Sequence, residues 1–262
     1  MNKSICAVMC HADDIELYAG GTVAKYVAQG YRMLYGLLSS CPSGWTVDEE
    51  LGGHHEPSAE IMPRRLAEAK AAAAVFGAEF WFGNLLGNCY TLKDGQSYIT
   101  PSYRGADAPP DDCPEGELLL VAAKPGMWPD LPIIDELADV LVEWEPELVV
   151  GQCIQNGNPD HFAAALIVAR AWKKAAEQVD IGPYWMSVAP PAQGRFQFPP
   201  LPADRLVDVT GHEELPMKAL SCHRTQGGHL DGMQGYMHRK WKHWGEQMGV
   251  PAAEGFMLVY EK

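Results

Sequence analysis

The sequence has no apolar run near the roughly eighteen residues that a membrane-spanning helix needs. Its seven cysteines include no Cys-x-x-Cys pair, and they do not form the dense disulfide framework of a small secreted domain. The N-terminus enters a strand-like segment with one lysine and no small-residue cleavage site, which argues against a signal peptide. We therefore expect reduced thiols, no membrane span and a cytoplasmic location.

Basic residues are also scarce. The chain has 20 Lys and Arg against 34 Asp and Glu, which gives a formal net charge of -14. This charge repels phosphate backbones and anionic membrane surfaces, so nucleic acid is not expected as a partner. No G-x-G-x-x-G follows the first predicted strand, and the acidic loop there would repel a pyrophosphate, which argues against a nucleotide-binding domain.

The chain is long and apolar enough to bury one large core, with 262 residues of which 47% are hydrophobic. We expect one domain over residues 1–262, with long loop insertions at about 39–62 and 85–131. Elsewhere strand-like and helix-like segments alternate, a pattern typical of parallel βαβ units with helices on both faces of a sheet. The expected strands cover residues 5–9, 31–40, 78–83, 147–153, 184–189 and 205–210. The expected helices cover residues 20–30, 63–77, 132–145, 161–178, 212–226 and 229–247, the first of them starting near Glu16.

Two polar clusters follow predicted strands. His11, Asp13 and Asp14 follow the first strand, and a loop ending at His161 follows the strand that ends near Cys153. Ligands of open parallel sheets bind where loops leave the carboxyl ends of the strands, so these clusters share one crevice if the two strands are neighbours. His11, Asp14 and His161 would then reach one ion, and imidazole and carboxylate are ligands that zinc prefers at catalytic sites. Asp13 would be free to deprotonate a water, which indicates metal-assisted hydrolysis.

Each cluster alone has an ordinary explanation. The acidic stretch is either a solvated loop or the site of a cation, and Asp13 or Asp14 could cap the helix that follows. Likewise, Asp160 could cap the helix that starts at or near His161. The same ligand types also suit ferrous iron. The joint occurrence of the two clusters at strand ends favours the metal site.

Four stretches resemble motifs of a known family. "CHADDIE" resembles the AHPDDxE signature and "NPDH" the HPDH signature of the LmbE/PIG-L family of metal-dependent N-acetylglucosaminyl deacetylases. "RRLAEAKAAAAVFGA" is similar to the R-x-x-E-A helix of that family, and "MKALSCHRTQ" to its C-terminal K-x-x-A-L-x-x-H-x-S-Q stretch. The four stretches occur in the family's order and cover most of the chain.

The resemblance implies a Rossmann-like three-layer αβα sandwich with a mostly parallel sheet. It implies a Zn²⁺ ion, with Fe²⁺ as the alternative, held by His11, Asp14 and His161, and Asp13 as the general base. Arg65 is expected to contact the substrate, an N-acetylated amino sugar or glycoconjugate, unless it is a surface residue paired with Glu68. A homo-oligomer is compatible with the resemblance.

Two departures from the motifs concern catalysis. Asn158 stands where the family has the first histidine of HPDH, and an amide donates a hydrogen bond but carries no proton charge. Asn156 stands where some members have an oxyanion-binding tyrosine. His223, in the C-terminal motif, is a candidate to replace the missing proton donor, although a helix-end histidine is an equally good interpretation. Asp160 is expected to orient His161 or its loop. The alternative function is a weakened member that binds a metal and a sugar-like ligand without efficient turnover.

Overall fold

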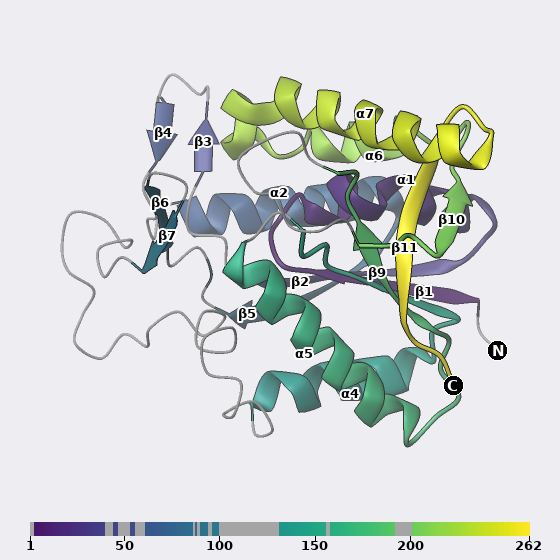
Figure 1. The fold of residues 1–262 in the computed structure, drawn as a ribbon. Helices are drawn as coiled ribbons and strands as arrows, with labels where there is room; N and C mark the ends of the chain where they lie inside the picture. Colours follow the sequence, from purple (N-terminus) through teal and green to yellow (C-terminus); the bar gives the residue numbers. More distant parts are fainter. Residues whose placement is uncertain are drawn as a thin grey trace, which may run out of the picture.

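A seven-stranded sheet with helices on both faces forms the centre of the computed structural model (Figure 1). The structure describes residues 3–39, 44–46, 53–55, 61–85, 87, 90–93, 96–99, 131–155, 158–191 and 201–262. Within these ranges, none of the helices combines the length and the apolar character that crossing a bilayer takes. The fold is the expected α/β sandwich.

The sheet has the strand order β10-β11-β9-β8-β1-β2-β5. Neighbouring strands from β9 to β5 run parallel, and β11 runs antiparallel to both β9 and β10. The strands are β1 (Ser4–Met9), β2 (Arg32–Ser39), β5 (Glu79–Leu85), β8 (Leu148–Gly151), β9 (Tyr184–Val188), β10 (Arg205–Asp208) and β11 (Ala253–Tyr260). The sheet is therefore mostly parallel, as predicted.

The helices of the described residues form two groups, one on each side of the sheet (Figure 1). The first group is α1 (Asp14–Ala28), α2 (Ile61–Phe76), α6 (Glu214–Leu220) and α7 (Leu230–Met248). The second group is α4 (Pro132–Trp144) and α5 (Pro159–Ala176). A 3-10 helix, η2 (Arg224–His229), joins α6 to α7, and two short hairpins are formed by β3 (Gly44–Thr46) with β4 (Gly53–His55) and by β6 (Tyr90–Lys93) with β7 (Gln96–Ile99).

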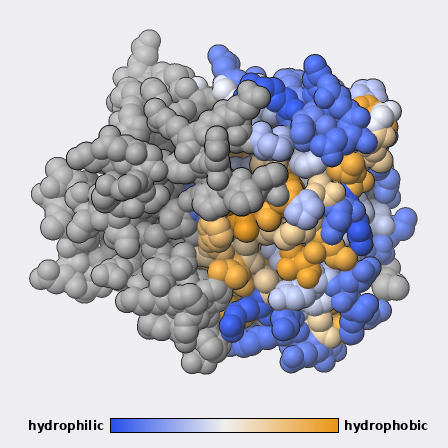
Figure 2. All heavy atoms as spheres, viewed as in Figure 1, coloured by the Kyte–Doolittle hydropathy of each residue, from blue (hydrophilic) through white to orange (hydrophobic). Residues whose placement is uncertain are grey.

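The core consists mainly of two apolar clusters, one on each face of the sheet. One cluster packs α4 and α5 against β1 and β8, and the other packs α1 and α2 against β1 and β2. Every residue of β1 is buried, because a central parallel strand is covered on both sides, and this explains its uninterrupted apolar sequence. The second half of β11 is only half-buried, and Figure 2 shows apolar side chains over β9, β11 and α5 between the polar surfaces of α7 and α4.

The predicted elements agree with the structure, with three differences. The expected helix over residues 212–226 is divided into α6 and η2. The helix expected to start near His161 starts at Pro159, because the side chain of Asn158 caps it. The strand β11 was not predicted, since Glu254 and Gly255 interrupt its apolar pattern. Apart from the two short hairpins, the predicted insertions at about 39–62 and 85–131 lie largely outside the described residues.

A buried ion pair ties α1 to the far edge of the sheet. Glu254, which is fully buried, accepts hydrogen bonds from the backbone N–H groups of Gly21 and Thr22 in α1. Lys240 of α7 donates to Glu254 at 3.0 Å and to the carbonyl oxygen of Leu17 at 2.6 Å. Each charge therefore has a partner in the core, as burial requires. The contacts fix the position of α1, whose first turn carries the polar cluster that follows β1.

The glycine pair of α1 has a packing role. A Cβ atom on Gly20 would lie 2.5 Å from the Cβ of Pro216 in α6, and one on Gly21 would lie 2.9 Å from the Cβ of Val209. Both distances are shorter than real Cβ contacts allow. The absence of side chains at these positions therefore lets α1 approach its neighbours closely.

Candidate metal centre and catalytic site

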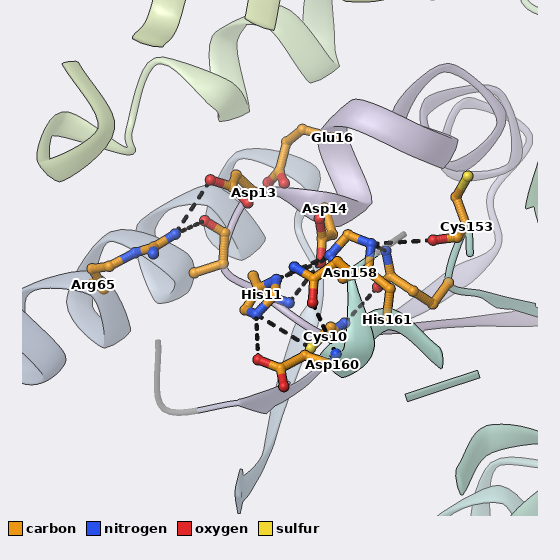
Figure 3. Close-up of polar contacts among 12 residues, drawn as sticks. Cys10, His11, Asp13, Asp14, Glu16, Arg65, Cys153, Asn158, Asp160 and His161 are labelled. Carbon is orange, nitrogen blue, oxygen red and sulfur yellow. Dashed lines mark hydrogen bonds and ion pairs between the residues drawn. The ribbon is translucent and has the colours of Figure 1, made fainter. Parts of the chain in front are cut away.

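The two polar clusters meet at one edge of the sheet. β1 and β8 are parallel neighbours, with Val8 opposite Gly151 at their carboxyl ends. The loop after β1 leads into α1, and the loop after β8 leads into α5, so the two helices begin side by side (Figure 3). The condition set by the sequence, that these strands are neighbours, is met.

Three donor atoms converge between these loops. Nδ1 of His11 lies 3.1 Å from Nε2 of His161, and Oδ2 of Asp14 lies 3.4 Å from each of those nitrogens. All three side chains are buried. Distances of this size between three ligand atoms leave a common point within coordinating reach of each one.

Each imidazole is held at its other nitrogen. Nε2 of His11 lies 3.3 Å from Oδ2 of Asp160, and Nδ1 of His161 lies 3.1 Å from the carbonyl oxygen of Cys153. These acceptors take the ring N–H and leave the lone pair of the second nitrogen toward the shared point. In the structure Asp160 therefore contacts the ring of His11, whereas the sequence analysis assigned it to His161 or its loop.

The pKa shifts of His161 and Asp14 suit a cation. Burial works to lower the pKa of His11, but Cys10, Asp14 and Asp160 raise it well above its ordinary value. Burial lowers the pKa of His161, which favours a neutral ring with a free lone pair. Burial alone would raise the pKa of Asp14, but His161 and His11 lower it, so Asp14 is a carboxylate. Two imidazoles and a carboxylate are a donor set that divalent zinc and iron both accept. The residues present therefore fit a divalent metal ion.

Asp13 is not one of the three donors and meets Arg65 of α2 (Figure 3). Nη2 of Arg65 lies 3.2 Å from Oδ2 of Asp13 and donates to the carbonyl oxygen of Ala12 at 3.3 Å. With its amide oxygen toward the guanidinium, Gln226 accepts from both terminal nitrogens of Arg65, at 3.0 and 2.9 Å. Arg65 thus fixes Asp13 and the turn that precedes α1.

The position of Arg65 differs from one of the two sequence interpretations, a surface arginine paired with Glu68. Only 3% of its surface is exposed, so it is not a surface residue of α2. Its ionic partner is Asp13, whereas Glu68 accepts hydrogen bonds from the backbone N–H and the hydroxyl of Thr225. Contact with substrate remains a prediction. Burial raises the pKa of Asp13 to about 6, and the positive charge of Arg65 opposes that rise.

Glu16, in the first turn of α1, is a further acidic residue close to His11, Asp13 and Asp14 in the sequence, and it has partners of its own. Its carboxylate accepts from the hydroxyl of Tyr35 at 3.1 Å and lies 3.5 Å from Nε2 of His223. Burial works to lower the pKa of His223, but Glu16 and Asp13 raise it above its ordinary value. His223 is fully buried on Glu16, which argues for a role in positioning the acidic turn.

Asn158 has a local role as the N-cap of α5. Its Oδ1 accepts from the backbone N–H of Asp160 at 2.8 Å. The cap fixes the first turn of α5, which carries both Asp160 and His161, since an N-cap side chain satisfies an otherwise unpaired helix N–H. Asn156, the other predicted substrate-binding residue of this loop, lies outside the described residues.

Comparison with known proteins finds similar sequences. A family model described as "PIG-L: GlcNAc-PI de-N-acetylase" matches residues 6–172, which include all three donors and Asp13. A 1D-myo-inositol 2-acetamido-2-deoxy-alpha-D-glucopyranoside deacetylase of Mycolicibacterium vanbaalenii is 26% identical over 242 residues, which cover 84% of this chain and 79% of that protein.

Solved structures show the same fold. The N,N'-diacetylchitobiose deacetylase of Pyrococcus horikoshii aligns with a TM-score of 0.62 and 18% identity over 98% of this chain and 84% of that one. The 4-carboxy-2-hydroxymuconate hydratase of Pseudomonas putida aligns with a TM-score of 0.63 and 20% identity over 100% and 98% of the two chains. Since a hydratase and a deacetylase share this fold, the fold alone does not decide the reaction.

Proposed function

The chain belongs to the PIG-L family of de-N-acetylases, and on this premise we propose that it hydrolyses the acetamide group of an N-acetylated amino sugar or glycoconjugate. Water adds to the acetamide carbonyl, the C–N bond breaks, and acetate and a free amine leave. The observation that carries this proposal is the convergence of His11, Asp14 and His161 on one point. Asp13 lies in the same loop but is not one of these donors, so its carboxylate is available for proton transfer.

We propose Zn²⁺ as the ion, with Fe²⁺ as the alternative, because the donor set is His, His and Asp. When bound, the ion supplies Lewis acidity, which lowers the pKa of a water toward about 7 and polarises the carbonyl of the substrate. His11, Asp14 and His161 hold it, and Asp160 fixes the ring of His11 from behind.

Asp13 is the proposed general base. Its carboxylate takes a proton from the attacking water and afterwards delivers a proton to the leaving amine nitrogen, so no net proton is left on the protein. Arg65 holds Asp13 through Oδ2, and the second carboxylate oxygen of Asp13 is the one that we assign to proton transfer. His223 acts indirectly, by holding Glu16 in the same turn of the chain.

Metal removal tests the proposed reaction. We expect that a chelator abolishes acetate release from an N-acetylated amino sugar and that added Zn²⁺ restores it, because the three donors have no other means of activating water. Acetate release is measured on chelated, dialysed enzyme with and without each of Zn²⁺ and Fe²⁺. Full activity of the chelated enzyme, with no metal detectable in the protein, would contradict the proposal.

A second candidate function is metal and ligand binding with little turnover, and Asn158 favours it. In place of a histidine that could carry a proton, this residue offers an amide whose oxygen already caps α5. A neutral donor stabilises a developing oxyanion less than a charged one does. On this interpretation the metal site is intact, and the hydrolysis of bound substrate is slow.

The substitution Asn158→His separates the two functions. If the enzyme is a deacetylase limited by this donor, we expect the rate of acetate release to rise about tenfold or more. Asn158→Ser is the matched control, since serine keeps the helix cap but supplies no charged donor. Measurable sugar binding without turnover in the wild type, Asn158→His and Asn158→Ser would instead favour the binding protein.

We also propose that the protein acts in the cytoplasm and that it can form a homo-oligomer. The first proposal is supported by its cysteines, because Cys6, Cys10, Cys153 and Cys222 are free thiols. The second extends the resemblance to the family and is open to a direct measurement of molecular mass in solution.

A further inference from the structure

One buried side chain, Gln152, touches both of the loops that carry the metal donors. It is the first residue after β8 and is fully buried. Its Oε1 accepts a hydrogen bond from the backbone N–H of Cys10 at 2.7 Å, and its Nε2 lies 3.0 Å from Nδ1 of His161. One amide therefore connects the residue that precedes His11 to the ring of His161.

The orientation of this amide is determined by its surroundings. The N–H of Cys10 can only donate, so it requires the oxygen of Gln152 rather than the nitrogen. The NH2 group is then directed at His161. Because the side chain is enclosed, with no exposed surface, it cannot turn to water to satisfy either end.

The contact with His161 limits the freedom of that ring. Nδ1 lies between the amide nitrogen of Gln152, at 3.0 Å, and the carbonyl oxygen of Cys153, at 3.1 Å. In the tautomer that leaves Nε2 free, Nδ1 donates its N–H to the carbonyl of Cys153, so the amide nitrogen of Gln152 packs against the ring without a hydrogen bond. On its opposite side, Nε2 is thereby directed at Nδ1 of His11 and at Asp14.

We propose that Gln152 is a positioning residue of the metal centre, which joins the loop after β1 to the loop after β8 and so sets the spacing of the donors. The inference rests on the proposed function only through the metal site that both require. A partner that fixes a metal-ligating histidine typically changes metal affinity by about 10- to 100-fold when it is removed. Gln152 holds the residue next to His11 through a hydrogen bond and packs against the ring of His161.

Two substitutions and a control test the role of Gln152. Gln152→Leu keeps the approximate shape and loses the hydrogen bond that holds Cys10 beside His11, so we expect it to weaken Zn²⁺ binding by about 10- to 100-fold. Gln152→Glu keeps an acceptor for Cys10, and its second oxygen can accept from an N–H at Nδ1 of His161. We expect its Zn²⁺ affinity to equal or exceed that of the wild type.

Gln155→Leu is the matched control. Gln155 lies in the same loop and also accepts a backbone hydrogen bond, from Ala189 at 2.6 Å, but it is directed at β9 and not at a metal donor. Its substitution should leave Zn²⁺ affinity within about twofold of the wild type. A loss caused only by a loosened loop would appear in this control too.

Zn²⁺ affinity is measured on the full-length, metal-free proteins by competition with a chromophoric chelator, and the visible absorption of bound Co²⁺ reports the geometry of the donors. Weaker binding by Gln152→Leu alone supports the role of Gln152. Wild-type affinity in Gln152→Leu overturns it, and so does an equal loss in Gln152→Glu or Gln155→Leu. If Gln152→Leu does not fold, Gln152→Met, which also lacks the amide but matches the length of the side chain, takes its place. No substrate is present, so the result is independent of whether the enzyme releases acetate.

Discussion

Asp13→Asn should lower kcat/KM for acetate release by about 10²- to 10⁴-fold, the usual contribution of a positioned general base. The amide has the shape of the carboxylate and can still accept from Arg65, so the turn before α1 should persist. It cannot take a proton from water at neutral pH. The effect should therefore fall on the chemical step.

The metal content of the Asp13→Asn enzyme separates this role from metal binding. Asp13 is not one of the three converging donors, so we expect Zn²⁺ per chain to match the wild type. Asp139→Asn, an exposed residue of α4, is the control for the substitution itself and should have no effect. An Asp13→Asn enzyme with wild-type kcat/KM would remove Asp13 from the mechanism and leave the metal site in place.

The close spacing of acidic groups after β1 has a simple physical explanation. Each carboxylate has different partners: Asp13 meets Arg65, Asp14 meets the rings of His11 and His161, and Glu16 meets His223. Like charges that share one site would raise one another's pKa, and separate partners reduce that cost. The stretch is therefore neither a solvated loop nor a helix cap, since Asp13 makes no side-chain capping hydrogen bond.

The sequence was sufficient to predict the donors and the sheet that brings them together. The strand–helix alternation identified β1 and β8, and the polar residues at their ends pointed to His11, Asp14 and His161. These inferences depend on local patterns and on the rule that ligands bind at the carboxyl ends of parallel strands. Such signals are present in the sequence because each involves only a few neighbouring residues.

Contacts between distant segments could not be predicted in the same way. The sequence suggests Glu68, three residues away, as an ionic partner of Arg65. In the structure the partner is Asp13, 52 positions earlier in the chain. The ion pair of Lys240 and Glu254 lies in a core where charged residues are rarely expected. Gln152 gave one weak signal, a polar residue directly after an apolar strand, and its role emerged only from its contacts.

The largest effect on metal binding is expected from the two histidines, which come from loops 150 residues apart. Loss of either imidazole leaves two donors, too few for a tightly held catalytic ion, which usually has three protein ligands. His11→Ala and His161→Ala should therefore both lose the metal while α1 and α5 stay folded. His238→Ala, an exposed histidine of α7, is the control.

The most direct test of the account is the metal content of the wild type, His11→Ala, His161→Ala and His238→Ala after equilibration with Zn²⁺ and removal of free metal. We predict about one tightly bound ion per chain in the wild type and in His238→Ala, and little or none in the other two variants. Metal retained at the wild-type level by either site variant, or absent from the wild type itself, would contradict the claim that the two loops share one ion.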